Sequence, residues 1–191
     1  MAAHSGGRYT RREILTAAAA VTLAVVSNAG AQAAKTCGAA TPSQTEGPYY
    51  KPNTPMRASL LEPGMPGTKL VIEGSVLTAD CKPVQRAMLD FWQADASGRY
   101  DNAGYRLRGH QLTNEAGRYR LETIVPAEYP GRTRHIHVKV QAPGQPALTT
   151  QLYFPDGNNQ RDSIFNPALV MPVRDVDGGK AASFDFILPA R

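Results

Sequence analysis

Long apolar runs are missing from this sequence of 191 residues. No stretch of 18 apolar residues occurs, so we expect no membrane-spanning helix in the mature protein. The charge excess is also small, at +5 for 21 Lys and Arg against 16 Asp and Glu, and the basic residues form no stripe. This charge pattern gives no indication of nucleic-acid binding. Internal repeats and low-complexity tails are missing too, and the length suits one small domain.

Cysteines are scarce, and the two present are Cys37 and Cys81. Neither lies in a Cys-x-x-Cys pair or beside a histidine, which gives little support for a thiol catalyst or a zinc site built on cysteine. In an oxidising compartment a lone pair of this kind is most simply a disulfide. The predicted bridge would close a loop of 44 residues and stabilise the fold by about 4 kcal/mol.

Residues 1–33 have the pattern of a cleaved export signal. Three arginines within the first twelve positions precede a run of thirteen residues rich in Ala, Val and Leu, and alternating alanines then offer cleavage sites. The segment Thr10–Leu15 contains an arginine pair and resembles the twin-arginine signal of bacteria; an ordinary secretory signal is the alternative. Either would leave a periplasmic or secreted chain that begins near Ala34 and meets the export machinery only transiently.

Beyond this signal the sequence predicts an all-β fold. Residues 34–68 are rich in Pro, Gly, Thr and Ser, and we expect them to form an extended N-terminal arm. Over residues 69–191 short β-like runs alternate with turn signals, and no segment has an apolar helical period. This spacing predicts an antiparallel β-sandwich that forms a single domain with the arm. The expected strands are Lys69–Thr78, Ala87–Asp95, Gly117–Ile124, His135–Gln141, Leu148–Phe154 and Ser183–Leu188.

The sharpest chemical feature is a His-Ile-His sequence on one of these strands. Because side chains alternate along a strand, His135 and His137 would share one face while Ile136, Val138 and Val140 point to the core. Two adjacent imidazoles are a common start of a metal site, but they can equally be a surface or hydrogen-bonded pair. No third histidine is near in the sequence to complete a metal site.

Two tyrosines are the further candidate ligands. Tyr129 precedes the histidine strand in a Pro- and Gly-containing loop, and Tyr100 follows an Ala-Ser-Gly turn. A phenolate is a hard anionic ligand that requires a strongly Lewis-acidic ion, so ferric iron suits it better than zinc or cuprous copper. A tyrosine in a turn is also a common packing residue, and the spacing alone leaves both roles open.

Several motifs in a fixed order resemble the intradiol ring-cleavage dioxygenases, which include protocatechuate 3,4-dioxygenase and catechol 1,2-dioxygenase. The resemblance extends from about residue 45 to residue 156, and the ordered series is more specific than any single motif. It implies a β-sandwich core, in agreement with the strand pattern. The motifs are Thr45-Glu46-Gly47-Pro48-Tyr49-Tyr50, Asp90-Phe91-Trp92-Gln93-Ala94-Asp95 with Gly98-Arg99-Tyr100, Gly117-Arg118-Tyr119, and Tyr129-x-x-Arg132-x-x-His135-Ile136-His137.

The resemblance implies a non-haem Fe(III) cofactor with four protein ligands. It also implies that the enzyme cleaves a catechol-type ring between its two hydroxylated carbons with O2, which gives a cis,cis-muconate-type diacid. The substrate would displace one tyrosine, which then accepts a hydroxyl proton. The implied ligands are Tyr100, Tyr129, His135 and His137, with Tyr129 as the one displaced.

Three further roles follow from the same resemblance. Arg132 would stabilise negative charge on the ring during oxygen attack. Gln151 would lie near the bound substrate, and Tyr49 would form part of the pocket wall. The expected partners are therefore a catechol-type small molecule and O2, and an oligomer is possible.

Only six positions separate Tyr129 from His135, a shorter gap than in the well-known cytoplasmic enzymes of the family, so the resemblance does not imply a particular ring substituent. Two other functions stay open at this point. One is a β-sandwich binding module without turnover. The other is a periplasmic copper or zinc protein that uses His135 and His137.

Overall fold

The computed structural model describes residues 1–2 and 37–189 of the chain. Contacts divide the chain into two units, Met1–Ala33 and Ala34–Arg191. Almost all of the predicted export signal lies outside the described residues. Within the described ranges, no helix has the length and apolar composition needed to cross a membrane.

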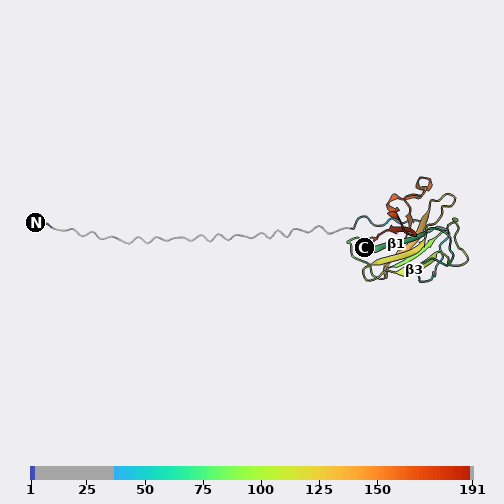
Figure 1. Ribbon diagram of the computed structural model, residues 1–191. Coiled ribbons are helices and arrows are strands. Elements are labelled where there is room, and N and C mark those ends of the chain that lie inside the picture. The colour runs from blue at the N-terminus through green and yellow to red at the C-terminus, as the bar shows by residue number, and fades with distance from the viewer. Residues whose placement is uncertain (3–36, 190–191) are drawn as a thin grey trace. The chain divides into compact units, whose positions relative to one another are not determined.

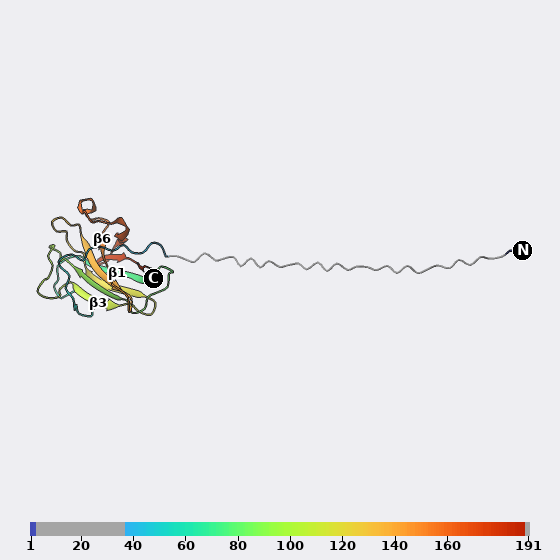
Figure 2. The same ribbon diagram turned by 180° about the vertical axis from the view of Figure 1, so that it is seen from behind.

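The strands of the second unit form two sheets that pack face to face, and Figure 1 labels one strand of each layer, β1 and β3. The first sheet has the order β4-β1-β8-β7 with β9 added beside β1, and the second has the order β3-β2-β5-β6. Figure 2 shows β6 of the second sheet from behind. This arrangement confirms the predicted all-β sandwich. The strands are β1 Lys69–Thr78, β2 Met88–Gln93, β3 Arg108–Leu112, β4 Arg118–Ile124, β5 His135–Gln141, β6 Leu148–Tyr153, β7 Val173–Val176, β8 Gly179–Ser183 and β9 Phe186–Leu188, and two 3₁₀ turns are η1 Asn159–Arg161 and η2 Pro167–Leu169.

Most predicted strands are present, but the expected strand Ser183–Leu188 is divided in two. β8 ends at Ser183 and β9 begins at Phe186, and each pairs in parallel with a different half of β1. Between them the backbone comes very close to β1, since a Cβ atom on Gly74 would lie 1.8 Å from the carbonyl oxygen of Phe184. Only a glycine in β1 permits this approach, which interrupts the last predicted strand.

The core fills the space between the two sheets. Ile136, Val138 and Val140 of β5 are fully buried in it, which confirms the predicted alternation of that strand. Burial of each such side chain stabilises the fold by about 1.5–3 kcal/mol. Other core members are Leu70, Ile72, Val76, Leu89, Phe91, Tyr119, Leu121, Leu152 and Phe186.

The outer face of the second sheet carries polar and aromatic side chains instead. Residues that pair directly across neighbouring strands share a face of the sheet, so the register places these side chains in rows. The two rows that run across β3, β2, β5 and β6 are Arg108–Trp92–His137–Gln151 and His110–Asp90–Lys139–Thr149.

The middle of the segment 37–68, from Gln44 to Arg57, lies along this polar face, whereas Thr41 and Leu60 bond to the carbonyls of Ile187 and Glu122 in the first sheet. The backbone N–H of Gln44 donates to the carbonyl of Thr149 at 2.8 Å, and that of Arg57 donates to the carbonyl of His110 at 2.8 Å. These bonds attach the segment to both edge regions of the sheet. The predicted arm region thus covers the face that carries the His-Ile-His pair.

A disulfide joins Cys37 to Cys81, as predicted. The backbone N–H of Cys37 also donates to the carbonyl of Ala79 at 3.2 Å. Both contacts attach the beginning of the described segment to the turn that follows β1.

Candidate metal centre

The two candidate tyrosines lie on loops that approach each other closely. Tyr100 lies between β2 and β3, and Tyr129 lies between β4 and β5. The N–H of Ala127 donates to the carbonyl of Asp95 at 3.0 Å and joins the loops. At Gly98 the φ angle is +77°, and a Cβ atom would lie 2.6 Å from the carbonyl oxygen of Glu128. A glycine is needed for this approach, which brings the Tyr100 and Tyr129 rings to a centroid distance of 5.8 Å.

Four predicted ligands converge on one point above β5. The Nε2 atoms of His135 and His137 are 3.1 Å apart. The hydroxyl oxygen of Tyr129 lies 3.4 Å from Nε2 of His135, and that of Tyr100 lies 3.5 Å from the same atom. The structure therefore brings together two nitrogen and two oxygen donors that are separated by up to 37 positions in the sequence.

The imidazoles present their ligating nitrogens inward. Nδ1 of His135 lies 2.6 Å from the carbonyl oxygen of Thr133, which can only accept, so Nδ1 carries the proton and Nε2 has the lone pair. Nδ1 of His137 is buried and has no hydrogen-bond partner among the described residues. A carbonyl that orients the far nitrogen is a common support for a metal-bound histidine.

Burial keeps all four groups neutral in the chain alone. Desolvation, with a further contribution from Arg132, lowers the pKa of His135 to about 4, and burial lowers the pKa of His137 well below its usual value. Burial likewise raises the pKa of Tyr100 and of Tyr129. The histidines are thus ready to donate lone pairs, whereas the phenols need a strongly Lewis-acidic cation to lose their protons.

The donor set fits a metal ion. Two neighbouring donors bound at about 2.1 Å would lie about 3 Å apart, close to the separation of the two Nε2 atoms. Within the described part of the chain, no group of three or more His, Cys, Asp or Glu residues could hold a metal ion. A metal ion at the His135/His137 pair would therefore need tyrosine oxygens, which favour ferric iron.

Arg132 and Gln151, the two residues expected to act on the substrate, lie beside these ligands. The Arg132 guanidinium donates to the side-chain oxygen of Gln151, and its Nε donates to the buried carboxylate of Asp162 at 2.9 Å. Burial alone would lower the pKa of Arg132, but the bond to Asp162 raises it. Gln151 is fully buried and donates to the carbonyl of Thr45 at 3.0 Å. The cation is thus fixed by two partners at the edge of the site.

Aromatic rings line the remaining sides. Tyr49 stacks on Tyr100 with ring centroids 4.4 Å apart and planes 15° apart, and it meets Tyr129 edge-on at 6.4 Å. Its place agrees with the predicted pocket wall. On the other side Trp92 stacks on His137 at 4.7 Å with planes 8° apart. The ring of His135 meets that of His137 edge-on at 4.7 Å, so each ligand ring packs flat or edge-on against a neighbouring ring.

A family model described as "Dioxygenase" matches residues 45–189, which include all of these side chains. The chain belongs to the intradiol dioxygenase family. Among its relatives, the chlorocatechol 1,2-dioxygenase of Pseudomonas sp. (strain P51) is 29% identical over 172 residues, covering 75% of this chain and 68% of that one. The catechol 1,2-dioxygenase of Candida albicans is 30% identical over 156 residues, covering 65% of this chain and 51% of that one.

Solved structures of the family agree with this assignment. The dioxygenase domain of a dioxygenase carbohydrate-binding protein fusion from Streptomyces sp. SirexAA-E is 52% identical, with a TM-score of 0.78, and the match covers 80% of this chain and all of that one. The 3-chlorocatechol 1,2-dioxygenase of Rhodococcus opacus 1CP is 29% identical, with a TM-score of 0.73, and the match covers 79% of this chain and 73% of that one. Family membership supports the dioxygenase interpretation and gives no support to the binding module or the copper or zinc protein.

Two contributors to the site, Asp162 and the contact of Trp92, and the whole of β3 were not identified from the sequence. Asp162 follows η1 and its sequence neighbours carry no motif, so nothing in the sequence pairs it with Arg132. The contact of Trp92 with His137 depends on the β2–β5 register, which no local pattern fixes. Arg108 opens β3, a strand that was not predicted. For Trp92, the one signal in the sequence was the alternation of side chains along β2, which places it on the polar face.

Proposed function

We propose that this chain is a non-haem Fe(III) intradiol dioxygenase that cleaves a catechol-type ring between its two hydroxylated carbons. One observation carries the proposal. In a chain of this family, the Oη atoms of Tyr100 and Tyr129 and the Nε2 atom of His137 all lie within 3.5 Å of Nε2 of His135. The overall change consumes one catechol and one O2 and gives one cis,cis-muconate-type diacid, so both oxygen atoms enter the product.

His135, His137, Tyr100 and Tyr129 would hold the ion. When bound, ferric iron supplies Lewis-acid binding of the two substrate oxygens and accepts electron density from the ring. Tyr129 would yield its place to the substrate, and its Oη atom would accept one of the two hydroxyl protons. No other described side chain is needed as a general base for that proton.

Arg132 would act on the substrate through charge. Its guanidinium is 17% exposed and is fixed by Gln151 and Asp162, so a positive charge stands beside the ligands in a largely dehydrated site. Such a preorganised cation stabilises negative charge that develops on the ring during oxygen attack. The aromatic walls of Tyr49 and Trp92 exclude water from the same space.

The test is the colour of the purified protein. Tyrosinate bound to ferric iron should give a red-brown colour, and the band should shift when catechol is added under nitrogen. In air, oxygen uptake with catechol should follow, and a panel of substituted catechols then ranks the substrates. A colourless protein with stoichiometric copper or zinc would refute the proposal. A coloured protein that consumes no oxygen with any catechol would support the iron site and refute the dioxygenase activity.

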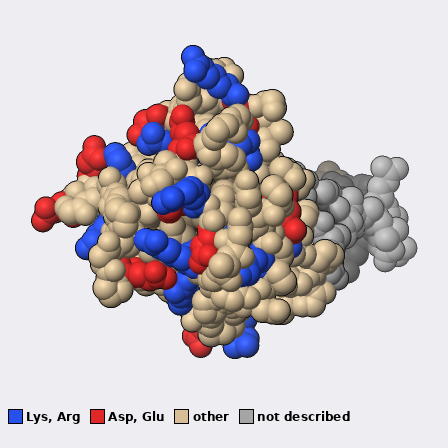
Figure 3. Space-filling view, turned by 90° about the vertical axis from the view of Figure 1, so that its right-hand side faces the viewer, with Lys and Arg blue, Asp and Glu red and all other residues tan. Residues whose placement is uncertain are grey.

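We also propose that the chain acts outside the cytoplasm, by way of the twin-arginine-type signal in residues 1–33. The Cys37–Cys81 disulfide supports this, because such bridges persist in oxidising compartments. The charges on the face in Figure 3 are mixed rather than of one sign, which fits a small-molecule substrate better than nucleic acid. Mass spectrometry of the exported protein should find a chain that starts near Ala34 and lacks the two cysteine hydrogens. An intact start at Met1 would contradict the proposal.

A further inference from the structure

Arg108 is a buried cation that makes no ion-pair contact with a carboxylate among the described residues, although Asp101 and Asp90 interact with it through space. Its side chain is fully buried, and among residues 37–189 it forms no ion pair with a carboxylate. Nε donates to the carbonyl of Asp101 at 3.0 Å, and Nη1 donates to the carbonyl of Tyr49 at 2.6 Å. Nη2 is buried with no hydrogen-bond partner in the described part of the chain. A charge buried in this way is unfavourable unless something else compensates it.

The two carbonyls that Arg108 holds flank Tyr100 on two sides. Asp101 is the next residue along the chain, and Tyr49 is the residue whose ring stacks on Tyr100 at 4.4 Å. The guanidinium carbon itself lies 5.9 Å from the centre of the Tyr100 ring. Arg108 also lies in the same row of the sheet as His137. The side chain of Arg108 thus fixes the backbone beside Tyr100 and that of Tyr49, whose ring covers Tyr100. It also places a positive charge near both rings.

The backbone before Arg108 is strained in the way that functional positions often are. Leu107 has a φ angle of +53°, although it is neither glycine nor asparagine, and its side chain is 2% exposed. A conformation of this kind is costly for a leucine and persists only where the surroundings enforce it. It turns the chain at the point where β3 begins with Arg108.

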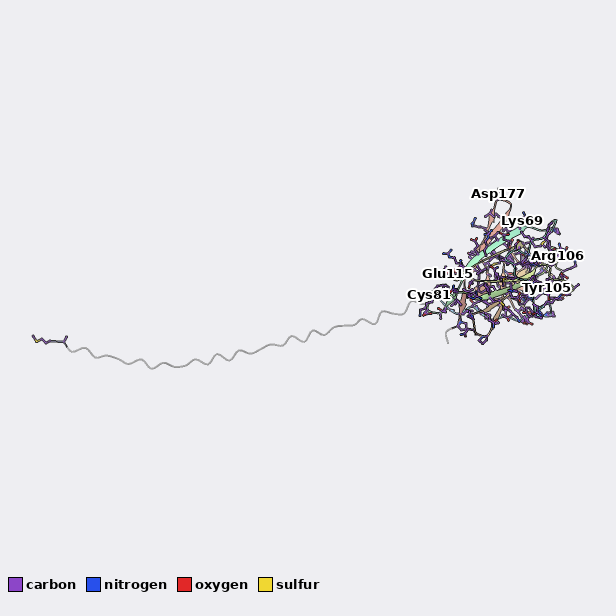
Figure 4. The ribbon with its side chains drawn as sticks, turned by 90° about the horizontal axis from the view of Figure 1, so that it is seen from below. Lys69, Cys81, Tyr105, Arg106, Glu115 and Asp177 are labelled. Carbon is purple, nitrogen blue, oxygen red and sulfur yellow. A yellow bond between two sulfur atoms is a disulfide. The ribbon has the colours of Figure 1, made fainter. Side chains whose placement is uncertain are left out.

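Two other cations hold the backbone of the loop that joins β2 to β3. Lys51 donates to the carbonyls of Ala103 and Gly104 at 2.9 Å each, and Arg57 donates to those of Tyr105 and Arg108. Figure 4 labels Tyr105 and Arg106 on the side of the folded part opposite to Cys81 and Glu115. Arg57 therefore makes bonds of the same kind as Arg108, in the same loop, without facing the ring of Tyr100.

We infer that Arg108 is a positioning residue of the metal centre, which fixes Tyr100 and its stacking partner Tyr49 and places a positive charge beside the tyrosine ligand. This inference rests on the proposed function, because it requires that the site hold ferric iron. It explains why carbonyls rather than a paired carboxylate hold the guanidinium: Asp101 and Asp90 act on it only through space, and the tyrosine oxygen of the loaded site would add a further negative charge beside it. It also explains why arginine stands here, since only its planar fork reaches two carbonyls with the charge between them.

The test uses three variants of the full chain: Arg108→Met, Arg108→Lys, and Arg57→Gln as the matched control. Iron affinity is measured by competition with a chelator, the position of the tyrosinate band by visible spectroscopy, and folding by thermal melting. Loss of a residue that supports a ligand typically costs 10–100-fold in metal affinity. We expect about that loss, with a shifted band, for Arg108→Met. Arg108→Lys should lose less, and Arg57→Gln should keep the wild-type affinity and band.

The outcomes separate this inference from the proposed function. A wild-type chain that binds no ferric iron would overturn both. A wild-type chain that binds iron, with both Arg108 variants folded and equal to it in affinity and band, would overturn the role of Arg108 alone. If Arg108→Met does not fold, Arg108→Lys decides the matter, because it retains the charge and the long stem. A Lys variant with unchanged affinity and band would then contradict the inference.

Discussion

The two tyrosines of the site, Tyr129 and Tyr100, differ in how firmly their surroundings hold them. Tyr100 is stacked on Tyr49 and flanked by the bonds of Arg108. Tyr129 lies in a tight turn that two backbone bonds to Arg132 close, with Gly131 at a φ angle of +81°. A ligand on such a turn can leave the ion by side-chain rotation while the turn stays intact, so Tyr129 is the better candidate for displacement.

The variant Tyr129→Phe tests this role. The oxygen that would bind the ion and take the substrate proton is lost, so we expect an altered visible band and a fall in kcat of about 10²–10⁴-fold. The fold should survive, because the ring remains. Tyr105→Phe is the control, since that hydroxyl donates to the carbonyl of Pro52 and is remote from the ligands. Unchanged oxygen uptake by Tyr129→Phe would refute the role.

Asp162 acts through Arg132. Its carboxylate is fully buried, accepts from Nε of Arg132 at 2.9 Å and from the backbone N–H of Thr133 at 3.2 Å. Asp162→Asn removes the counter-charge while keeping the shape, and breaking such a pair typically costs about 3–5 kcal/mol. We expect a lower free energy of unfolding in urea and a kcat/KM about 10–100-fold lower, with iron and colour retained. Loss of iron would show that Asp162 supports the ligands rather than the arginine.

Among the structural elements, the segment 37–68 carries its own prediction. It is attached at its start by the Cys37–Cys81 disulfide and further along by its bonds to β6 and β3. Replacing both cysteines by serine should lower the free energy of unfolding by about 4 kcal/mol, the loop-closure value for a separation of 44 residues. The visible band should not change, because the bridge joins Cys37 to the turn after β1 of the first sheet, whereas the histidine ligands lie on β5 of the second sheet. Figure 4 labels Cys81 at this end of the fold. Equal denaturation curves for variant and wild type would contradict this prediction.

An element could be predicted from the sequence where its own residues form a clear pattern. The alternation of β5 placed His135 and His137 on one face and its apolar residues in the core, and the structure agrees. β3, with the sequence Arg-Gly-His-Gln-Leu, has no β-branched residue and has a glycine at its second position, so propensity gave no signal. Its antiparallel pairing with β2 stabilises a strand that its own residues do not favour. The roles inferred for Arg108 and Asp162 depend on such long-range pairings, which no window of the sequence contains.

For the whole molecule, the proposed ferric ion would stabilise the folded chain. An ion that binds only the folded chain adds about 2.7 kcal/mol when its concentration is 100 times Kd. Removing ferric iron with a reductant and a chelator should therefore lower Tm by about 5–10 °C for a domain of this size, as measured by calorimetry. The double variant His135→Ala/His137→Ala should show no such difference between treated and untreated samples. A wild-type Tm that does not respond to iron removal would contradict the expected site.

The segment that covers the polar face is synthesised first, whereas β6, to which it binds, comes last among the strands of that sheet. Thr45 and Gln151 are 106 positions apart. At about 5–20 residues per second the ribosome needs about 5–20 s to make the partner of Thr45. The surroundings of the proposed metal centre are therefore assembled only when most of the chain exists, and a ferric ion would enter the completed site after that point. An export route that carries folded proteins would let that loading take place in the cytoplasm, before the chain leaves it.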